Sequence, residues 1–315
     1  MTPFAGKAAR RAGDDLLDRD SAALLNRVSR DNLERWVRHL AGAYPTRHTL
    51  GEHIGAAADW LAERFRSFGY DRVERASYRR AGRSLPNVIC VKPAAGPAGL
   101  GGDPAAGTVI LCAHFDSRSE RGEDPRAPAP GADDNASGVA VLLETARLLA
   151  VRRSGIPVRF AAFSGEEQGL WGAEAYAERI RRGRLRVRFV LNLDQVGHPP
   201  RSGTLTIERD AGNRVAANDA ASHALADRMR RLARRYTGLP TRFGPIYGSD
   251  YLPFEARGFT VAGLYEGEGY PAYHTTRDTA EKVNFAYLHD VARLTLATVL
   301  NEEQAGAVAP SPSPP

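Results

Sequence analysis

The sequence predicts an α/β protein in which a central mixed, mostly parallel β-sheet is flanked by helices on both faces. Apolar strand-like segments alternate with helical segments along most of the chain, and such alternation is typical of a sheet covered by helices. The length of 315 residues is sufficient to bury a full core, and the hydrophobic fraction of 43% and the charged fraction of 25% are ordinary for a globular protein.

The first part of the chain is expected to be mainly helical. Residues 1–42 are predicted to form an N-terminal helical extension, because apolar side chains such as Leu33 and Trp36 recur there at helical spacing. A clearer helix is expected over residues 50–68, with its apolar side chains on one face and Gly69 just past its end. The strand-like segments that follow span residues 72–78 and 86–91.

The alternating region and the tail complete the expected organisation. A single α/β domain is predicted over residues 43–304, and the tail at 305–315, which is rich in proline, is predicted to be disordered. The strands of the alternating region are expected at 108–113, 157–163, 187–193, 204–208 and 259–264, and its helices at 136–150, 172–182, 219–236, 251–257 and 284–303.

Composition and charge restrict the expected partners and location. The net charge is +6, but the arginine clusters at 179–188 and 228–235 lack interleaved aromatic residues, so they predict solvated helix faces and no nucleic-acid partner. No stretch approaches the roughly 20 apolar residues of a membrane helix, so no membrane association is expected. The N-terminus shows no apolar signal segment, which predicts a cytoplasmic protein, or a secreted or periplasmic one if an upstream signal was removed. A monomer is the default expectation.

Acidic residues and histidines gather where the predicted strands end. In open α/β sheets, ligands bind outside the carboxyl ends of the strands. Such side chains follow four of the predicted strands and also precede one predicted helix. They are His114, Asp116, Glu166, Glu167, Asp194 and His274 after strands, and Asp133 and Asp134 before helix 136–150. We therefore expect all of them to lie on one edge of the sheet.

Five of these residues form a ligand set for two metal ions. They supply two imidazoles and three carboxylates, which are groups that zinc binds readily: His114, Asp133, Glu167, Asp194 and His274. One bridging carboxylate would leave two further ligands for each metal. Glu166 would then be free to act as a base. The carboxylates would repel one another in a shared pocket without cations, so the combination favours a metal centre, although each residue singly is also typical of a helix cap or a structural histidine.

Six segments of the chain, within residues 45–300, resemble the M28 family of co-catalytic zinc aminopeptidases and come in the order of that family. The segments are AHFDS at 113–117, PGADDNASG at 130–138, FSGEEQGLWGA at 163–173, LNLDQVG at 191–197, GSDYLPF at 248–254 and YHTTRDT at 273–279. The resemblance implies a zinc aminopeptidase-like fold and a zinc-dependent exopeptidase that holds two Zn²⁺ ions and acts on peptides.

The resemblance also implies a role for each matching residue. His114 and Asp194 would bind one zinc, Glu167 and His274 would bind the other, and Asp133 would bridge them. The family tends to have a cis peptide bond after the bridging aspartate, which would fall here between Asp133 and Asp134.

Three further residues are implied to act around the metals. Glu166 would be the general base that takes a proton from a water bridging the metals. The resulting hydroxide would attack the substrate. Tyr273 would donate a hydrogen bond to the substrate carbonyl oxygen. Asp116 would orient His114, and Asp278 is placed to do the same for His274.

Three alternatives stay open beside the aminopeptidase. A glutaminyl-cyclase-like enzyme and a carboxypeptidase can use the same fold, and a non-catalytic binding domain would be expected to have lost ligands. The complete ligand set and the Tyr273–His274 pair favour hydrolysis. One departure from the family is Tyr251, which stands where many members have histidine after Ser-Asp, and we expect it to affect the shape of the pocket.

Overall fold

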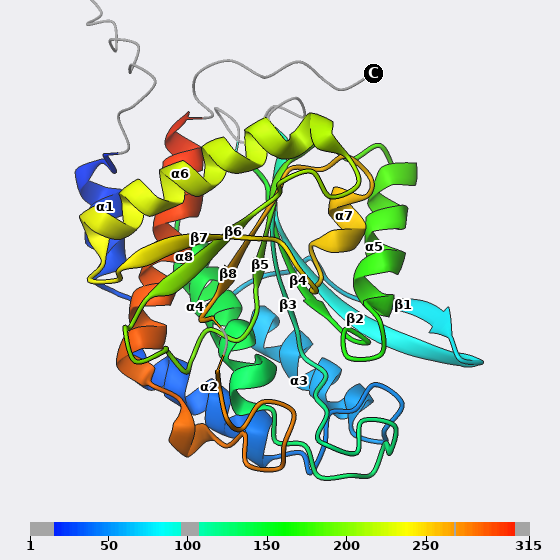
Figure 1. Ribbon diagram of the computed structural model, residues 1–315. Helices are drawn as coiled ribbons and strands as arrows, with labels where there is room; N and C mark the ends of the chain where they lie inside the picture. Colours follow the sequence, from blue (N-terminus) through cyan, green and yellow to red (C-terminus); the bar gives the residue numbers. More distant parts are fainter. Residues whose placement is uncertain (1–15, 96–106, 268, 306–315) are drawn as a thin grey trace, which may run out of the picture.

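A mixed eight-stranded sheet runs through the centre of the molecule (Figure 1). The computed structural model describes residues 16–95, 107–267 and 269–305. The strands are β1 (Val73–Arg80), β2 (Arg83–Lys92), β3 (Thr108–His114), β4 (Val158–Phe163), β5 (Val187–Leu193), β6 (Leu205–Arg209), β7 (Thr241–Pro245) and β8 (Val261–Tyr265).

The pairing of the strands confirms the predicted sheet. Their order is β1-β2-β4-β3-β5-β8-β6-β7. The central strands β4, β3, β5 and β8 pair in parallel, as β6 and β7 also do. Antiparallel pairs join β1 to β2, β2 to β4 and β6 to β8. Every residue of β3 is buried, as expected for a strand in the middle of a sheet that is covered on both faces.

Helices cover both faces of this sheet (Figure 1). The helices are α1 (Arg19–Leu25), α2 (Arg30–Gly42), α3 (Ile54–Ser67), α4 (Gly138–Ala150), α5 (Trp171–Arg182), α6 (Asp219–Tyr236), α7 (Leu252–Glu255) and α8 (Phe285–Ala305). Helices α5 and α7 pack on one face around Phe163, Tyr176 and Phe254. The remaining helices contribute to a second and larger cluster on the other face.

The N-terminal helices pack into the larger cluster. The Ser29 hydroxyl caps α2 by accepting a hydrogen bond from Asn32 N, and the apolar side chains of α2 are buried beside those of α4 and α8. The helical extension predicted over 1–42 is therefore part of the main core where it is described. Residues 1–15 and the tail predicted to be disordered lie outside the described residues, except for Ala305, which ends α8.

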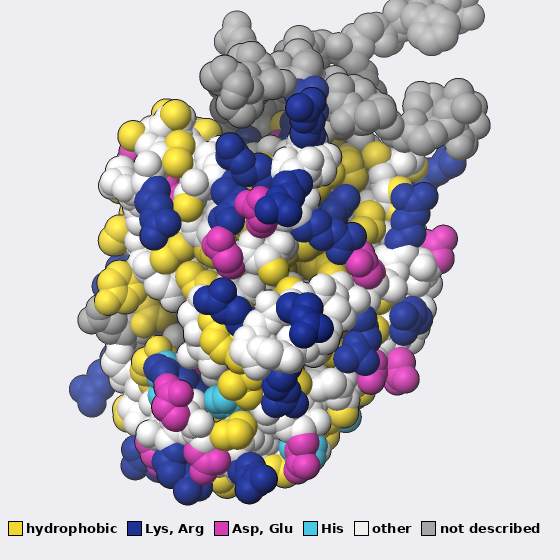
Figure 2. Space-filling model, turned by 90° about the vertical axis from the view of Figure 1, so that its right-hand side faces the viewer, with side chains coloured by type: hydrophobic (Ala, Val, Ile, Leu, Met, Phe, Trp, Pro, Cys, Tyr) yellow, Lys and Arg dark blue, Asp and Glu magenta, His cyan; other side chains and the backbone are white. Residues whose placement is uncertain are grey.

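Several arginines of the predicted solvated clusters lie in ion pairs on an exposed face. Arg179 pairs with Glu74 at 2.8 Å, and Arg182 pairs with Glu178 at 2.6 Å. Figure 2 shows arginine and lysine side chains interspersed with acidic ones on the side of the molecule that it presents. Among the described residues, no helix has the length and apolar character needed to cross a membrane.

The parallel strands bring their carboxyl ends to one edge of the sheet. His114 is the last residue of β3, and Asp194 directly follows β5. Glu166 and Glu167 lie in the turn between β4 and α5. A wide helical turn of the π type at Ala132–Ser137 leads into α4 and carries the two adjacent aspartates. The fold thus brings segments that are far apart in sequence to a single edge.

Candidate metal centre

One group of potential metal ligands forms around the imidazole of His114. Its Nε2 atom lies 3.2 Å from Asp134 Oδ1 and 3.2 Å from Asp194 Oδ1. His114 is 1% exposed and Asp194 is 8% exposed. The ligand atoms of these three residues all lie within 4.8 Å of one another, which suits a single metal ion.

A second group forms around His274, in the loop after β8. The Nε2 atom of His274 lies 3.0 Å from Asp134 Oδ2 and 3.0 Å from Glu167 Oε2. These ligand atoms also lie within 4.8 Å of one another. Asp134 belongs to both groups and turns one carboxylate oxygen to each imidazole, so it has the position of a bridging ligand.

The prediction that Asp133 is the bridge is wrong by one residue. Asp133 is fully buried, and its Oδ1 accepts a hydrogen bond from Gly197 N at 2.7 Å. Its carboxyl group faces that of Glu266, and it forms no ion pair with either histidine among those found in the described residues. The backbone turns sharply here because Asp134 and Asn135 have non-helical φ and ψ angles, so successive side chains face different surroundings. The cis peptide bond accordingly joins Asp134 to Asn135, one position later than predicted.

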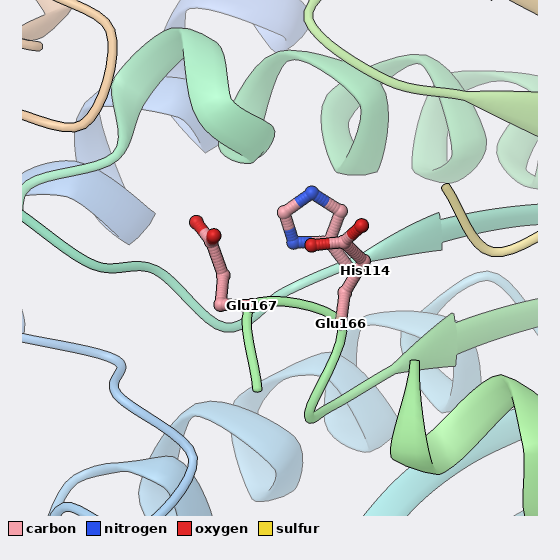
Figure 3. Close-up of side chains that lie close together, drawn as sticks. All are labelled: His114, Glu166 and Glu167. Carbon is pink, nitrogen blue, oxygen red and sulfur yellow. The ribbon is translucent and has the colours of Figure 1, made fainter. Parts of the chain in front are cut away.

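Glu166 and Glu167 project from one turn, Glu166 to the imidazole of His114 and Glu167 to one side of it (Figure 3). The side chain of Glu167 is only 3% exposed, and the two glutamates together with His114 form a third group of ligand-type side chains within 4.8 Å. Glu167 pairs with His274, whereas Glu166 has no ion pair to either histidine among those found in the described residues. Glu166 therefore lies beside His114 without the ion pair that Glu167 makes to His274.

Asp116 lies behind His114, as predicted. Its Oδ1 is 3.6 Å from His114 Nδ1, and its backbone oxygen is 3.3 Å from the same nitrogen. The Asp116 carboxylate also accepts the backbone N–H groups of Glu166 and Glu167, each at 3.3 Å. Asp116 thus joins the imidazole to the turn that carries both glutamates.

In the loop after β8, the role of Tyr273 toward a substrate stays a prediction, whereas the structure contradicts the prediction for Asp278. The ring of Tyr273 stacks on that of His274 with centroids 3.6 Å apart, and the side chain is 46% exposed at the mouth of the site. Asp278 does not orient His274. Instead its carboxylate accepts the backbone N–H groups of Asp133 at 2.9 Å and Asp134 at 3.0 Å, so it supports the turn.

Burial and charge determine which groups hold protons. Burial alone would lower the pKa of His274, but the carboxylates of Asp134 and Glu167 outweigh it and raise the pKa to about 9. The pKa of His114 is likewise raised, because Asp194 and Glu166 outweigh its burial. Burial raises the pKa of Glu167 to about 7.

The protonation of Asp134 is different. Burial would raise its pKa, but hydrogen bonds from both histidines hold it below its usual value. The two imidazoles thus favour the ionised form of Asp134, and divalent cations bound to this set would stabilise the same charge.

The donor set fits zinc. It combines imidazole nitrogens and carboxylate oxygens in two groups, as zinc prefers. In addition, the buried Glu167 Oε1 has no hydrogen-bond partner among the described residues, although buried carboxylate oxygens normally have one. A metal ion would satisfy that oxygen.

Two further side chains at the site were not singled out from the sequence. The guanidinium of Arg118 lies 3.0 Å from Glu167 Oε2, and its Nη2 lies 2.7 Å from His274 Nδ1. Ser249 donates to Asp194 Oδ2 at 2.6 Å and accepts a hydrogen bond from Asn192. Both residues fall within or beside the quoted motifs, but nothing in the residue types reveals which ligand they contact.

A family model relates the whole of this arrangement to known proteins. The model of peptidase family M28 matches residues 98–299. The chain belongs to this family. The match spans all the residues of both ligand groups in this M28 protein, and it begins downstream of α1, α2 and α3.

Individual relatives agree with the family. A protein of Pyrenophora teres f. teres that is named a probable zinc metalloprotease is 37% identical over 194 residues, which is 58% of this chain and 42% of the relative. The chain thus spans less than half the length of that relative.

Solved structures share the fold of this M28 protein. The LapA aminopeptidase of Legionella pneumophila has a TM-score of 0.75 at 19% identity, covering 96% of this chain and 79% of LapA. The glutaminyl cyclase of Porphyromonas gingivalis has a TM-score of 0.68 at 21% identity, covering 86% of this chain and 97% of the cyclase. At these identities the likeness concerns the fold.

Proposed function

We propose that this protein is an aminopeptidase that holds two zinc ions and hydrolyses N-terminal residues from peptides. The observation that carries the proposal is the position of Asp134, whose two carboxylate oxygens lie 3.2 Å from His114 Nε2 and 3.0 Å from His274 Nε2. A carboxylate shared by two imidazole groups in this way supports a pair of metal ions rather than one.

The ligands divide into two sets around Asp134. His114 and Asp194 would hold one zinc, and Glu167 and His274 would hold the other. Zinc ions bound there would polarise the scissile carbonyl and lower the pKa of water toward about 7.

Glu166 would carry out the proton transfers of the reaction. Burial raises the pKa of Glu166 well above its usual value, and Asp194 and Glu167 add to the effect. Such a carboxylate takes a proton from the water that attacks the carbonyl carbon. It then returns the proton to the leaving amine nitrogen as the C–N bond breaks.

Tyr273 and an acidic side chain of the pocket would bind the substrate through hydrogen bonds. The half-exposed Tyr273 hydroxyl would donate to the carbonyl oxygen as negative charge develops on it. The free α-amine of a peptide is a cation, and the carboxylate of Glu166 would provide a charge-assisted acceptor for it. An N-terminal substrate therefore suits the charge of this pocket better than a C-terminal carboxylate does.

Two of the similar proteins support the aminopeptidase proposal, and a third represents the alternative function of a glutaminyl cyclase. The fungal relative is named a metalloprotease and the LapA structure an aminopeptidase, whereas the Porphyromonas gingivalis structure is a glutaminyl cyclase of the same fold. The two chemistries differ in product. Hydrolysis cuts a peptide bond, and cyclisation of N-terminal glutamine releases ammonia without cutting one.

Aminoacyl anilides with free and with acetylated amines test the proposal. We expect zinc-loaded protein to cleave the free compounds and not the acetylated ones, because acetylation removes the charge that the carboxylate of Glu166 would bind. Release of ammonia from N-terminal glutamine without anilide cleavage would identify a cyclase. Cleavage that tolerates a blocked amine but requires a free carboxylate would identify a carboxypeptidase, and either outcome contradicts the aminopeptidase.

A further inference from the structure

A short buried segment contacts the three loops that carry His114, Asp134 and the Glu166–Glu167 pair. Residues Thr46–Thr49 lie between α2 and α3, and Arg47 and Thr49 are both 0% exposed. This 46–49 segment lies outside residues 98–299, where the family model matches. None of its side chains contacts a ligand atom of either metal group in the contacts found among the described residues.

Arg47 connects two ligand-bearing loops by their backbones. Its Nε donates to the carbonyl of Phe115 at 2.7 Å, between His114 and Asp116. Its Nη1 and Nη2 donate to the carbonyls of Pro130 at 2.6 Å and Gly131 at 2.8 Å, just before the turn with Asp134. The approach is close enough that a β-carbon at position 131 would lie 2.9 Å from Nη2.

Thr49 connects the third loop to Asp116. Its hydroxyl accepts a hydrogen bond from Gly165 N at 2.7 Å and donates one to Asp116 Oδ2 at 2.9 Å. Because a backbone N–H is only a donor, the hydroxyl proton is directed at the carboxylate. The opposite oxygen of Asp116 lies 3.6 Å from His114 Nδ1. The Thr49 hydroxyl therefore makes the shortest of three hydrogen bonds that orient the Asp116 carboxylate, the other two coming from the backbone N–H groups of Glu166 and Glu167.

The other two residues hold the segment itself in place. Thr46 forms an isolated parallel bridge with Ala129. The ring of His48 accepts a hydrogen bond from Leu50 N at 3.1 Å through Nδ1, and its Nε2 lies 2.9 Å from the carbonyl of Gly122. The segment is consequently anchored on both sides of Arg47 and directly before Thr49.

We infer that Thr49 is a positioning residue of the reaction, and that it acts through Asp116 on the imidazole of His114 and on the turn that carries Glu166. The inference rests on the proposed function. Hydrogen-bond partners behind a metal ligand fix its orientation, and their loss typically costs about 10- to 100-fold in metal affinity or activity. Arg47 holds the two loops in register, but it makes too many buried bonds for its replacement to be a clean test.

The comparison of Thr49→Val with Thr49→Ser tests the role of the hydroxyl. Valine keeps the shape and removes the hydroxyl, and serine keeps the hydroxyl. We expect Thr49→Val to lose about 10- to 100-fold in zinc affinity or in kcat, with a smaller change in KM, and Thr49→Ser to recover most of the loss. Zinc affinity is measured by competition with a chromophoric chelator. The visible absorption of cobalt-loaded protein reports the ligand geometry and should shift in Thr49→Val only.

A matched control separates this role from stability. Thr295→Val makes the same change at a fully buried threonine of α8, whose hydroxyl donates to the Val291 carbonyl at 3.0 Å. It should leave metal affinity, cobalt absorption and kcat unchanged, even if the melting temperature falls as much as in Thr49→Val. Thr49→Ala gives the same comparison if the valine variant does not fold.

The inference is overturned if the Thr49 variants without the hydroxyl keep wild-type zinc affinity, cobalt absorption and kcat. It is also overturned if serine does not restore what valine loses, or if Thr295→Val shows the same losses. Zinc affinity and cobalt absorption require no turnover. An inactive wild-type protein would therefore contradict the proposed peptidase while these two measurements still decide the role of Thr49.

Discussion

At the scale of single residues, Asp133 and Asp134 are adjacent, chemically identical and differently placed. Asp134 lies between two imidazoles, whereas Asp133 faces Gly197 and Glu266. The residue types of the turn offer two equal candidates, and only the backbone angles of the turn choose between them. The sequence could therefore predict that an aspartate bridges, but it could not decide which one.

Substitution of each aspartate by asparagine distinguishes the two positions. We expect Asp134→Asn to lose the second equivalent of zinc, because the amide removes the shared negative charge from both ligand groups. Asp133→Asn should keep two equivalents, since its side chain lies outside both groups. Metal analysis after dialysis against limiting zinc measures the stoichiometry. Loss of zinc in Asp133→Asn with retention in Asp134→Asn would restore the original assignment.

Glu166→Gln tests the base without changing the size of the side chain. We expect the variant to keep its zinc and to lose at least about 10²-fold in kcat, since a glutamine cannot accept a proton from water. Glu167→Gln serves as the comparison, because Glu167 lies 3.0 Å from His274 Nε2 and its replacement should weaken zinc binding instead. Turnover of Glu166→Gln near the wild-type kcat would remove Glu166 from the proposed mechanism.

At the scale of elements, most helices and strands follow from apolar periodicity. The strands β3, β4 and β5 are mostly apolar segments, and the sequence predicts their bounds within a residue or so. The strand β7 was missed, because Thr241–Pro245 is short, ends in Gly-Pro and lies at the edge of the sheet with little apolar character. The 46–49 segment was also missed, since its role depends on contacts with loops that are far away in sequence.

Tyr251, which stands where many family members have histidine, joins two elements of the fold in a way that the sequence could not predict. Tyr251 is buried, donates its hydroxyl to Glu208 Oε1 of β6 at 3.0 Å and accepts a hydrogen bond from Tyr247 N. Burial raises the pKa of Glu208 to about 8, although the hydrogen bond from Tyr251 opposes this effect. The tyrosine thus ties α7 to β6 beside a carboxyl group that prefers to stay protonated.

Glu208→Gln should reduce the dependence of stability on pH. The folded-state pKa of Glu208 lies above its value of 4.5 in the unfolded chain, so its contribution to stability is complete below about pH 4.5 and is lost as pH rises through about 8. A single such group lowers the free energy of unfolding by up to about 1.4 kcal/mol per pH unit within that window. The neutral amide retains an acceptor for Tyr251 and does not ionise. We expect denaturant unfolding at pH 6 and pH 8 to show a smaller difference for the variant, and an equal or larger difference would contradict the assignment.

At the scale of the whole molecule, the proposed metal ligands come from five separate segments at one edge of the sheet. His114, Asp134, Glu167, Asp194 and His274 are held by β3, the turn before α4, and the loops after β4, β5 and β8. The larger core cluster includes the N-terminal helices as well, so the sheet, its helical layers and the metal site are expected to unfold together. A cation bound across these loops therefore stabilises the entire fold.

Zinc should raise the melting temperature of the protein through both ligand groups. A ligand that binds only the folded state stabilises it by about 2.7 kcal/mol when its free concentration is 100 times its Kd, which corresponds to a shift on the order of 5 °C for a domain of this size. Asp59→Asn is a suitable control, because it removes a carboxylate that is 56% exposed and pairs with Arg75 outside the site. We expect this control to show the full zinc-dependent shift and Asp134→Asn to lose most of it. An equal shift in both variants, measured by differential scanning calorimetry with and without zinc, would mean that zinc stabilises the protein from somewhere other than this centre.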